Sequence, residues 1–139
     1  MGAMILGNEQ FITRARRIRK GMGGGMRQVG ILAAAGIVAL ETMVSRLAED
    51  HANARKLATG LSKIDGIICD PDSYPTNLVF CDVSAKNPNE ILQKLDERGV
   101  KALSLPAGWR LVTHYGITSD DIDYALDVIK DVFKEYATI

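Results

Sequence analysis

The chain of 139 residues is long enough for one domain with a real core, and a composition of 47% hydrophobic and 24% charged residues is ordinary for a globular protein. Seventeen basic and seventeen acidic residues leave no net charge, which argues against a nucleic-acid-binding protein, since those usually carry a basic excess. The charge is uneven, however: residues 1–28 carry six basic groups against one acid, and residues 111–139 carry six acids against two lysines. This asymmetry favours an internal or intersubunit site.

The first stretch of the chain predicts the stub of a strand whose pairing partner is not in this chain, followed by a basic helix. Met4–Gly7 is short, apolar and ended by glycine, and Asn8 is a good N-cap for the helix that follows. Apolar residues then recur at helical spacing on one side, which we expect to face inward, while the arginines occupy the other side. These apolar residues are Phe11, Ile12, Ala15 and Ile18.

A glycine cluster, Gly23–Gly25, follows the basic helix, with Lys20 before it and Arg27 after it. Glycines let a ligand approach the backbone closely, and flanking cations make such a turn a natural seat for a phosphate or carboxylate. The alternative is a helix–loop–helix whose charges only solvate its surface. The cluster is not a Walker loop, because the string Gly-x4-Gly-Lys-Ser/Thr does not occur in the sequence. It is not a dinucleotide fingerprint either, because Met26 stands where that motif requires its last glycine and no strand is predicted directly before it.

A long helix is predicted next. Its first part, Val29–Leu40, is apolar on nearly all sides, which is typical of a helix buried on all sides. These twelve residues are too few to cross a bilayer, which takes about twenty, so we expect no membrane span. One helix over residues 27–62 would be roughly 54 Å long, more than a compact domain of this size covers. We therefore expect one end to pack against something outside this sequence.

The second half predicts strand, strand, helix, strand, strand, helix. The strands are expected over 67–69, 76–83, 100–105 and 109–115, and the helices from Asn87 to Arg98 and from Ser119 onward. This order is that of an α+β fold, in which long N-terminal helices precede a small, mainly antiparallel sheet with helices on one face. Alternation in the fourth strand places Arg110 on one face with Val112 and His114, opposite Trp109.

Cys69 and Cys81 are the only cysteines, and both stand in strand-like contexts. We expect two buried free thiols in a reducing, cytoplasmic protein, because no disulfide framework or signal peptide is visible. A metal site is not expected, because His51 and His114 add no recognisable ligand spacing.

Five segments together resemble the C-terminal part of low-specificity L-threonine aldolases. They are a basic run ending in Gly23-Gly-Gly-Met-Arg-Gln28, an alanine-rich helix, Arg46-Leu-Ala-Glu-Asp-His51, Thr76-Asn-Leu-Val-Phe80 and Arg110-Leu-Val-Thr-His114. The resemblance covers almost the whole chain in order. It implies a fold like that of aspartate aminotransferase, pyridoxal phosphate (PLP) as cofactor, and cleavage of β-hydroxy amino acids such as threonine to glycine and an aldehyde. It also implies a homo-oligomer, usually a tetramer, with sites near subunit boundaries.

Site residues follow from the same resemblance. Lys20 and Arg27 match basic residues near the active site or the cofactor phosphate, some of which reach in from a neighbouring subunit, and Arg110 matches the arginine that holds the substrate carboxylate. The lysine that bonds the cofactor would precede this chain, together with the large PLP-binding domain. We therefore expect a fragment without catalytic residues of its own: residues 1–28 as the end of the large domain, 29–65 as an interdomain helix, and 66–139 as the small domain.

Two other interpretations remain open at this point. The chain could belong to another PLP-dependent enzyme, either aminotransferase-like or a β-eliminating lyase. It could also be a naturally short, non-catalytic assembly module. An aldehyde product from threonine would separate the first interpretation from an aldolase, and coding sequence upstream of Met1 would exclude the second.

Overall fold

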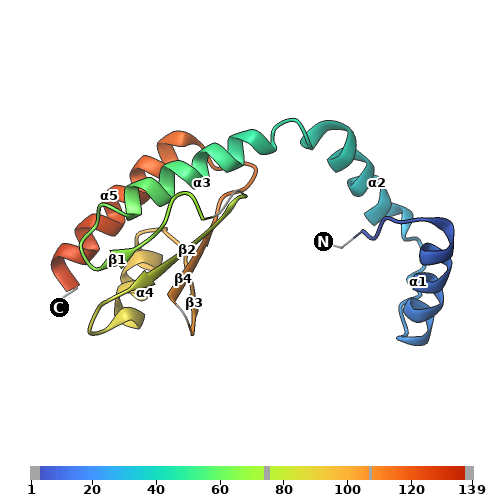
Figure 1. Cartoon of the computed structure of the whole chain (residues 1–139), viewed down its shortest axis with the longest axis horizontal. Helices are drawn as coiled ribbons and strands as arrows, with labels where there is room; N and C mark the ends of the chain where they lie inside the picture. The colour runs from blue at the N-terminus through green and yellow to red at the C-terminus, as the bar shows by residue number, and fades with distance from the viewer. Residues whose placement is uncertain (1–3, 74–75, 107, 137–139) are drawn as a thin grey trace. The chain divides into compact units, whose positions relative to one another are not determined.

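A computed structural model describes residues 4–73, 76–106 and 108–136, and these form two compact units, divided between Arg46 and Leu47. The first unit is helical. It contains α1 (Glu9–Gly21), α2 (Gly30–Val38) and a π-helical segment, η1 (Ala39–Met43). The second unit contains α3 (Leu47–Leu61), α4 (Pro88–Glu97), α5 (Ser119–Tyr136) and four strands (Figure 1).

The second unit is the predicted α+β layer. Its strands are β1 (Ile67–Ile68), β2 (Leu78–Val83), β3 (Leu103–Leu105) and β4 (Gly108–Val112), which pair in the order β1-β2-β4-β3. All three pairings are antiparallel. The helices pack on one face, where α3 and α5 run side by side (Figure 1). The α+β fold class is thereby confirmed.

The core lies between that helical layer and the sheet. Alternate strand residues enter it, as the period of two in a strand requires: Val79 and Cys81 from β2 and Trp109 and Leu111 from β4 are buried. The helices complete it with Leu57, Leu61, Ile91, Leu95, Ile129 and Val132. The opposite face of the sheet carries Phe80 and Arg110, and no helix of the second unit covers it among the residues that the structure describes.

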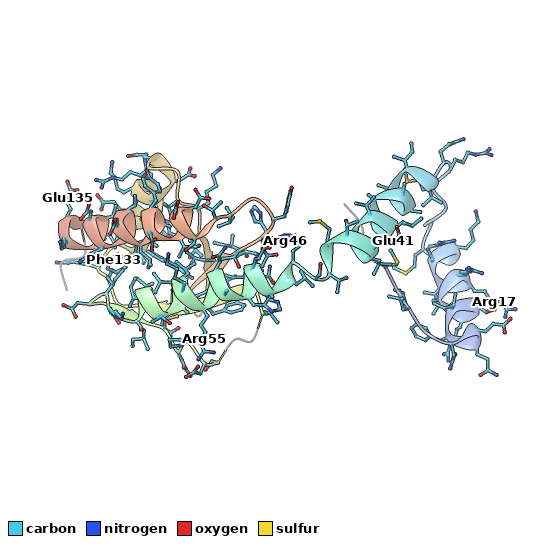
Figure 2. The ribbon with its side chains drawn as sticks, turned by 90° about the horizontal axis from the view of Figure 1, so that it is seen from above. Arg17, Glu41, Arg46, Arg55, Phe133 and Glu135 are labelled. Atoms are coloured by element: carbon cyan, nitrogen blue, oxygen red, sulfur yellow. The ribbon has the colours of Figure 1, made fainter. Side chains whose placement is uncertain are left out.

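The first unit has a different character, since none of its described residues is buried. The Asn8 side chain caps α1 as predicted, accepting a hydrogen bond of 2.9 Å from the Phe11 backbone N–H. Phe11 and Ile18 share one face of α1 but stay 51% and 56% exposed. The described residues of this unit therefore leave that face of α1 largely uncovered. Arg17, on the outer side, extends from α1 into solvent (Figure 2).

Two expectations differ from the structure. Met4–Gly7 is not a strand, because a strand needs a neighbour to take its backbone hydrogen bonds and the described residues provide none. The single helix expected over 27–62 is divided into α2, η1 and α3, with turn conformation at residues 44–46 where the two units meet in sequence. No single helix among the described residues is long and apolar enough to cross a membrane. Only the broken pair Gly30–Met43 and Leu47–Leu61 together would meet such a test by length and composition.

Candidate functional site

Arg110 lies in the middle of β4, on the open face of the sheet. Its cross-strand partners are Phe80 in β2 on one side and Leu103 in β3 on the other. The residue is half-buried, and its Nε is shielded from solvent without a hydrogen bond to any described group. A shielded N–H without an acceptor is costly, by about 1–3 kcal/mol, so its retention calls for an explanation.

The neighbours of Arg110 in sequence hold it in that orientation. Trp109 and Leu111 are buried, and the Trp109 ring meets Phe133 of α5 edge-on, with ring centroids 5.8 Å apart. Because these residues fill the core, alternation directs Arg110 to the opposite face, as the sequence predicted. Gly108 lets β4 approach β2 closely: its φ is +118°, and a Cβ there would collide with the carbonyl oxygen of Cys81.

Hydrogen bonds fix the chain just after β4. The Thr113 backbone N–H donates to the Asn77 carbonyl at 3.0 Å, and the Asn77 amide donates to the Thr113 carbonyl at 2.7 Å. The buried Thr113 hydroxyl donates to the Asp50 carbonyl of α3 at 2.6 Å. Thr113 and Asn77 stand in the sequence only as parts of the two strand motifs, and the structure gives them a positioning role. The sequence feature that could have identified them is a short polar residue next to an apolar strand: Asn77 directly precedes β2 and Thr113 directly follows β4.

His114, which follows Thr113, lies beyond the end of β4. It is exposed, and its Nδ1 is 2.8 Å from the carbonyl oxygen of the neighbouring Tyr115. The expected sharing of one strand face with Arg110 therefore stops at Val112, where β4 ends. This local contact gives His114 no evident chemical role.

Lys20 and Arg27 lie in the first unit, on either side of the glycine cluster. The chain leaves α1 tightly, with the Gly24 N–H donating to the Arg19 carbonyl at 2.8 Å. Lys20 Nζ lies over Gly25, 3.2 Å from where a Cβ would stand, so a larger residue at this position would displace the end of the lysine side chain slightly. Arg27 is exposed and precedes Gln28, whose φ of +51° is in the left-handed region. Such strain often marks functional turns.

Neither cation of this loop is neutralised within the described part of the chain, where no ion pair is recorded for Lys20 or Arg27. Exposed cations beside closely approachable backbone can bind an anionic oxygen group. The predicted site residues thus fall into two groups: Lys20 and Arg27 together at one loop, and Arg110 in the second unit. Each group is suited to binding an anion.

The two thiols do not add a metal site. Cys81 is buried as expected, whereas Cys69 is half-buried and lies just past the end of β1. Burial raises the pKa of Cys81 to about 12, and burial also raises the pKa of Cys69, so both remain protonated at neutral pH. No group of three or more potential metal ligands occurs among the described residues.

Comparison with known proteins places the chain in a family. Residues 1–84, more than half of its length, match the beta-eliminating lyase family. The chain belongs to the beta-eliminating lyase family. This family is PLP-dependent, which agrees with the cofactor implied by the sequence resemblance.

Within this family, curated relatives include low-specificity L-threonine aldolases. A probable low-specificity L-threonine aldolase 2 of Arabidopsis thaliana is 37% identical over 96% of this chain. A low specificity L-threonine aldolase of Escherichia coli (strain K12) is 40% identical over 88% of it. The chain spans only 39% and 35% of the lengths of these two relatives. The resemblance inferred from the motifs is confirmed, for about a third of such an enzyme.

A solved structure supports the fold. The cystine C–S lyase C-DES, in complex with its reaction product cysteine persulfide, matches with a TM-score of 0.54 and 24% identity. The match covers 60% of this chain and 23% of that one. At this identity the likeness establishes the fold alone.

Proposed function

We propose that this chain is the C-terminal part of a PLP-dependent aldolase that cleaves L-threonine or L-allo-threonine to glycine and acetaldehyde. Its similarity to threonine aldolases over some nine-tenths of its length supports this substrate class. The observation that carries the proposal is the shielded, unpartnered Nε of Arg110 on the open face of the sheet. An N–H that is shielded from solvent and has no acceptor in the protein is suited to donate a hydrogen bond to an oxygen atom of a bound ligand.

Arg110 would hold the substrate carboxylate. A planar guanidinium grips a carboxylate with two parallel hydrogen bonds, and Phe80 and Leu103 on either side lower the polarity around them. These two hydrogen bonds would fix the orientation of the substrate carboxylate. They would leave the β-hydroxyl of the substrate available to other groups of the active site. The role is therefore one of orientation, which contributes to catalysis by holding reacting groups in place.

Lys20 and Arg27 would hold the phosphate of PLP, in their own subunit or in a neighbouring one. Their exposed charges and the open backbone at Gly25 fit an anion of that size and charge. When bound, PLP supplies an electron sink for the pair of electrons released as the Cα–Cβ bond breaks. The contribution of this chain is anion binding, and we assign it no catalytic base.

The proposal includes a cytoplasmic homo-oligomer, usually a tetramer in enzymes that this chain resembles. Two free thiols favour a reducing compartment. The uncovered apolar residues of the first unit favour association, either with a larger PLP domain or with neighbouring subunits.

The test is made on an enzyme that contains this chain, supplied with PLP. We expect aldehyde release from L-threonine or L-allo-threonine. Hydrogen bonds to charged groups contribute about 1.5–3 kcal/mol each, so Arg110→Lys should lower kcat/KM about a hundredfold, at about 1.4 kcal/mol per factor of ten. Cofactor absorbance should remain. Arg55→Lys is the matched control, because Arg55 is an exposed arginine paired with Asp72 and should leave kcat/KM unchanged.

Near-normal kcat/KM in Arg110→Lys would make Arg110 structural and remove the site assignment. A substrate whose carboxylate is replaced by an amide sharpens the result. The parent enzyme should discriminate strongly against it, whereas Arg110→Lys should hardly discriminate.

A β-eliminating lyase is the second candidate, and the description of the matched family favours it. Such an enzyme would release pyruvate and ammonia from cysteine or cystine and no aldehyde from threonine. An aminotransferase-like enzyme would instead require a 2-oxo acid as amino acceptor. A non-catalytic assembly module would give none of these products, so product identity separates all four.

A further inference from the structure

We propose that Cys69 and Cys81 are a cross-strand thiol pair that a hydroperoxide oxidises to an intramolecular disulfide. The proposal concerns a modification site in the second unit and does not depend on the proposed activity. It rests on the pairing of β1 with β2, on the contact of the Cys69 sulfur and on the electrostatic interaction between the two thiols.

The strand register places the two cysteines opposite each other. In the antiparallel pair β1–β2, Ile67 faces Val83 and Ile68 faces Asp82. Cys69 directly follows the end of β1, and continuing this register by one residue brings it opposite Cys81. Ile67 and Val83 lie on the core side of the sheet, and a step of two returns to the same side, so both thiols point toward it.

The hydrogen-bond pattern also favours a disulfide at this position. Ser84 N–H donates to the Gly66 carbonyl at 2.8 Å, which makes Gly66 and Ser84 a hydrogen-bonded pair. Since such pairs alternate with non-hydrogen-bonded ones, Cys69 and Cys81 fall at a non-hydrogen-bonded position. Opposed Cα atoms there are typically about 4.5 Å apart, within the span of about 4.4–6.8 Å that a disulfide bridges.

The side chains agree with this placement. Cys69 Sγ lies 3.5 Å from the carbonyl oxygen of Phe80, in the peptide group that leads directly into Cys81. Burial is the main cause that raises the pKa of Cys81, and a charge interaction with Cys69 adds to it. The half-buried Cys69 is the thiol that an oxidant reaches first, and the buried Cys81 is the one that resolves it.

With hydrogen peroxide as the oxidant, the chemistry balances in two steps. The Cys69 thiolate attacks peroxide, an S–O bond forms, the O–O bond breaks and hydroxide leaves, giving a sulfenic acid. Cys81 sulfur then attacks the Cys69 sulfur, the S–S bond forms, and the sulfenic oxygen leaves as water with the Cys81 proton. Two thiols are oxidised and one peroxide is reduced to two waters. Because the pKa of each thiol is raised, the reaction should be slow at neutral pH and faster in alkali.

The experiment uses the full chain under native conditions. After treatment with hydrogen peroxide, the chain is denatured, remaining thiols are alkylated and the intact mass is measured. We expect a product lighter by two hydrogens that carries no alkyl group and reverts with dithiothreitol. A protease that cleaves before aspartate cuts at Asp70 and separates the cysteines, so a linked peptide identifies the bridge. Two alkylated thiols, a sulfinic acid or a disulfide between chains would each overturn the proposal.

A matched variant tests whether the strand register is responsible. The double substitution Ile68→Cys with Cys69→Ser moves the thiol by one residue along the chain. The thiol then has Asp82 as its cross-strand partner and lies on the face of the sheet away from Cys81. Under native conditions we expect the disulfide of this variant to form at about one tenth of the parent rate or below. Two Cβ vectors that point apart cannot be bridged without backbone movement. In urea, both proteins should oxidise at similar rates. Equal rates under native conditions would show that register does not select the pair.

Discussion

The two compact units use apolar residues in opposite ways. In the first unit, residues 4–46, no described residue is buried, although α2 consists entirely of small or apolar residues. In the second unit, all seventeen buried hydrophobic residues of the described chain gather between three helices and a sheet. Apolar content alone therefore does not make a core. A helix that is apolar on all sides needs neighbours on all sides, and the first unit has too few of them.

Hydrogen exchange should show this contrast most strongly. We expect the amides of Val79, Ile129 and Val132 to exchange only on global unfolding of the second unit, whereas those of α1 and α2 exchange through local opening. The difference should reach about a thousandfold, or about 4 kcal/mol. The measurement is made on a dilution series of the full chain. Protection of α2 at the lowest concentration equal to that of α5 would show that the first unit is stable alone.

A pair of identical substitutions compares the units at single residues. Leu95 of α4 is fully buried, whereas Leu40 of η1 is 54% exposed. Leu95→Ala should lower the free energy of unfolding by about 2–5 kcal/mol, because it leaves a cavity in the core. Leu40→Ala should change it by about 0.5 kcal/mol or less.

The only tryptophan, Trp109, is in the second unit, so its fluorescence in a urea titration reports the unfolding of that unit. A similar loss of stability in both variants would mean that the units share one cooperative core. The contrast drawn between them would then be wrong.

The sequence predicted the second unit better than the first for a physical reason. Strand alternation around Trp109 and Arg110 and the caps of its helices are local patterns, and the core that they imply is completed within the unit. The conformations of Met4–Gly7 and of residues 27–62 depend instead on packing neighbours, and the described residues cover little of their surface. Their conformations could therefore not be read from local pattern alone.

The candidate site shows the same division. Motif resemblance identified Arg110, Lys20 and Arg27, but only the coordinates show that Arg110 keeps an unpartnered Nε and that Thr113 and Asn77 fix the end of its strand. Hydrogen bonds between residues 36 positions apart in sequence leave no periodic signal. The pairing of Cys69 with Cys81 likewise depends on register, which the spacing of the two strands does not determine.

The smallest expected effect is a loss of stability in alkali that is confined to the second unit. The pKa of Cys81 is raised from 9.0 to about 12 in the folded chain, chiefly by burial, so above pH 9 the unfolded chain gives up this proton while the folded chain keeps it. The folded state then binds more protons than the unfolded state, and stability falls as pH rises from 9.0 toward about 12. Below pH 9 this contribution is fully present. A single group adds a slope of at most about 1.4 kcal/mol per pH unit.

Urea titrations at pH 8.0–10.5, followed through Trp109, compare the parent chain with Cys81→Ala. Other groups that titrate in alkali, such as lysines and tyrosines, affect both proteins equally, so the difference between their slopes isolates Cys81. We expect Cys81→Ala to be less stable at pH 8, because burial of the sulfur is lost, but to lose stability less steeply above pH 9. Cys69→Ala, which changes the less buried thiol, should show a smaller change in slope. Parallel slopes in the parent and Cys81→Ala would mean that Cys81 ionises as readily in the folded chain as in the unfolded one.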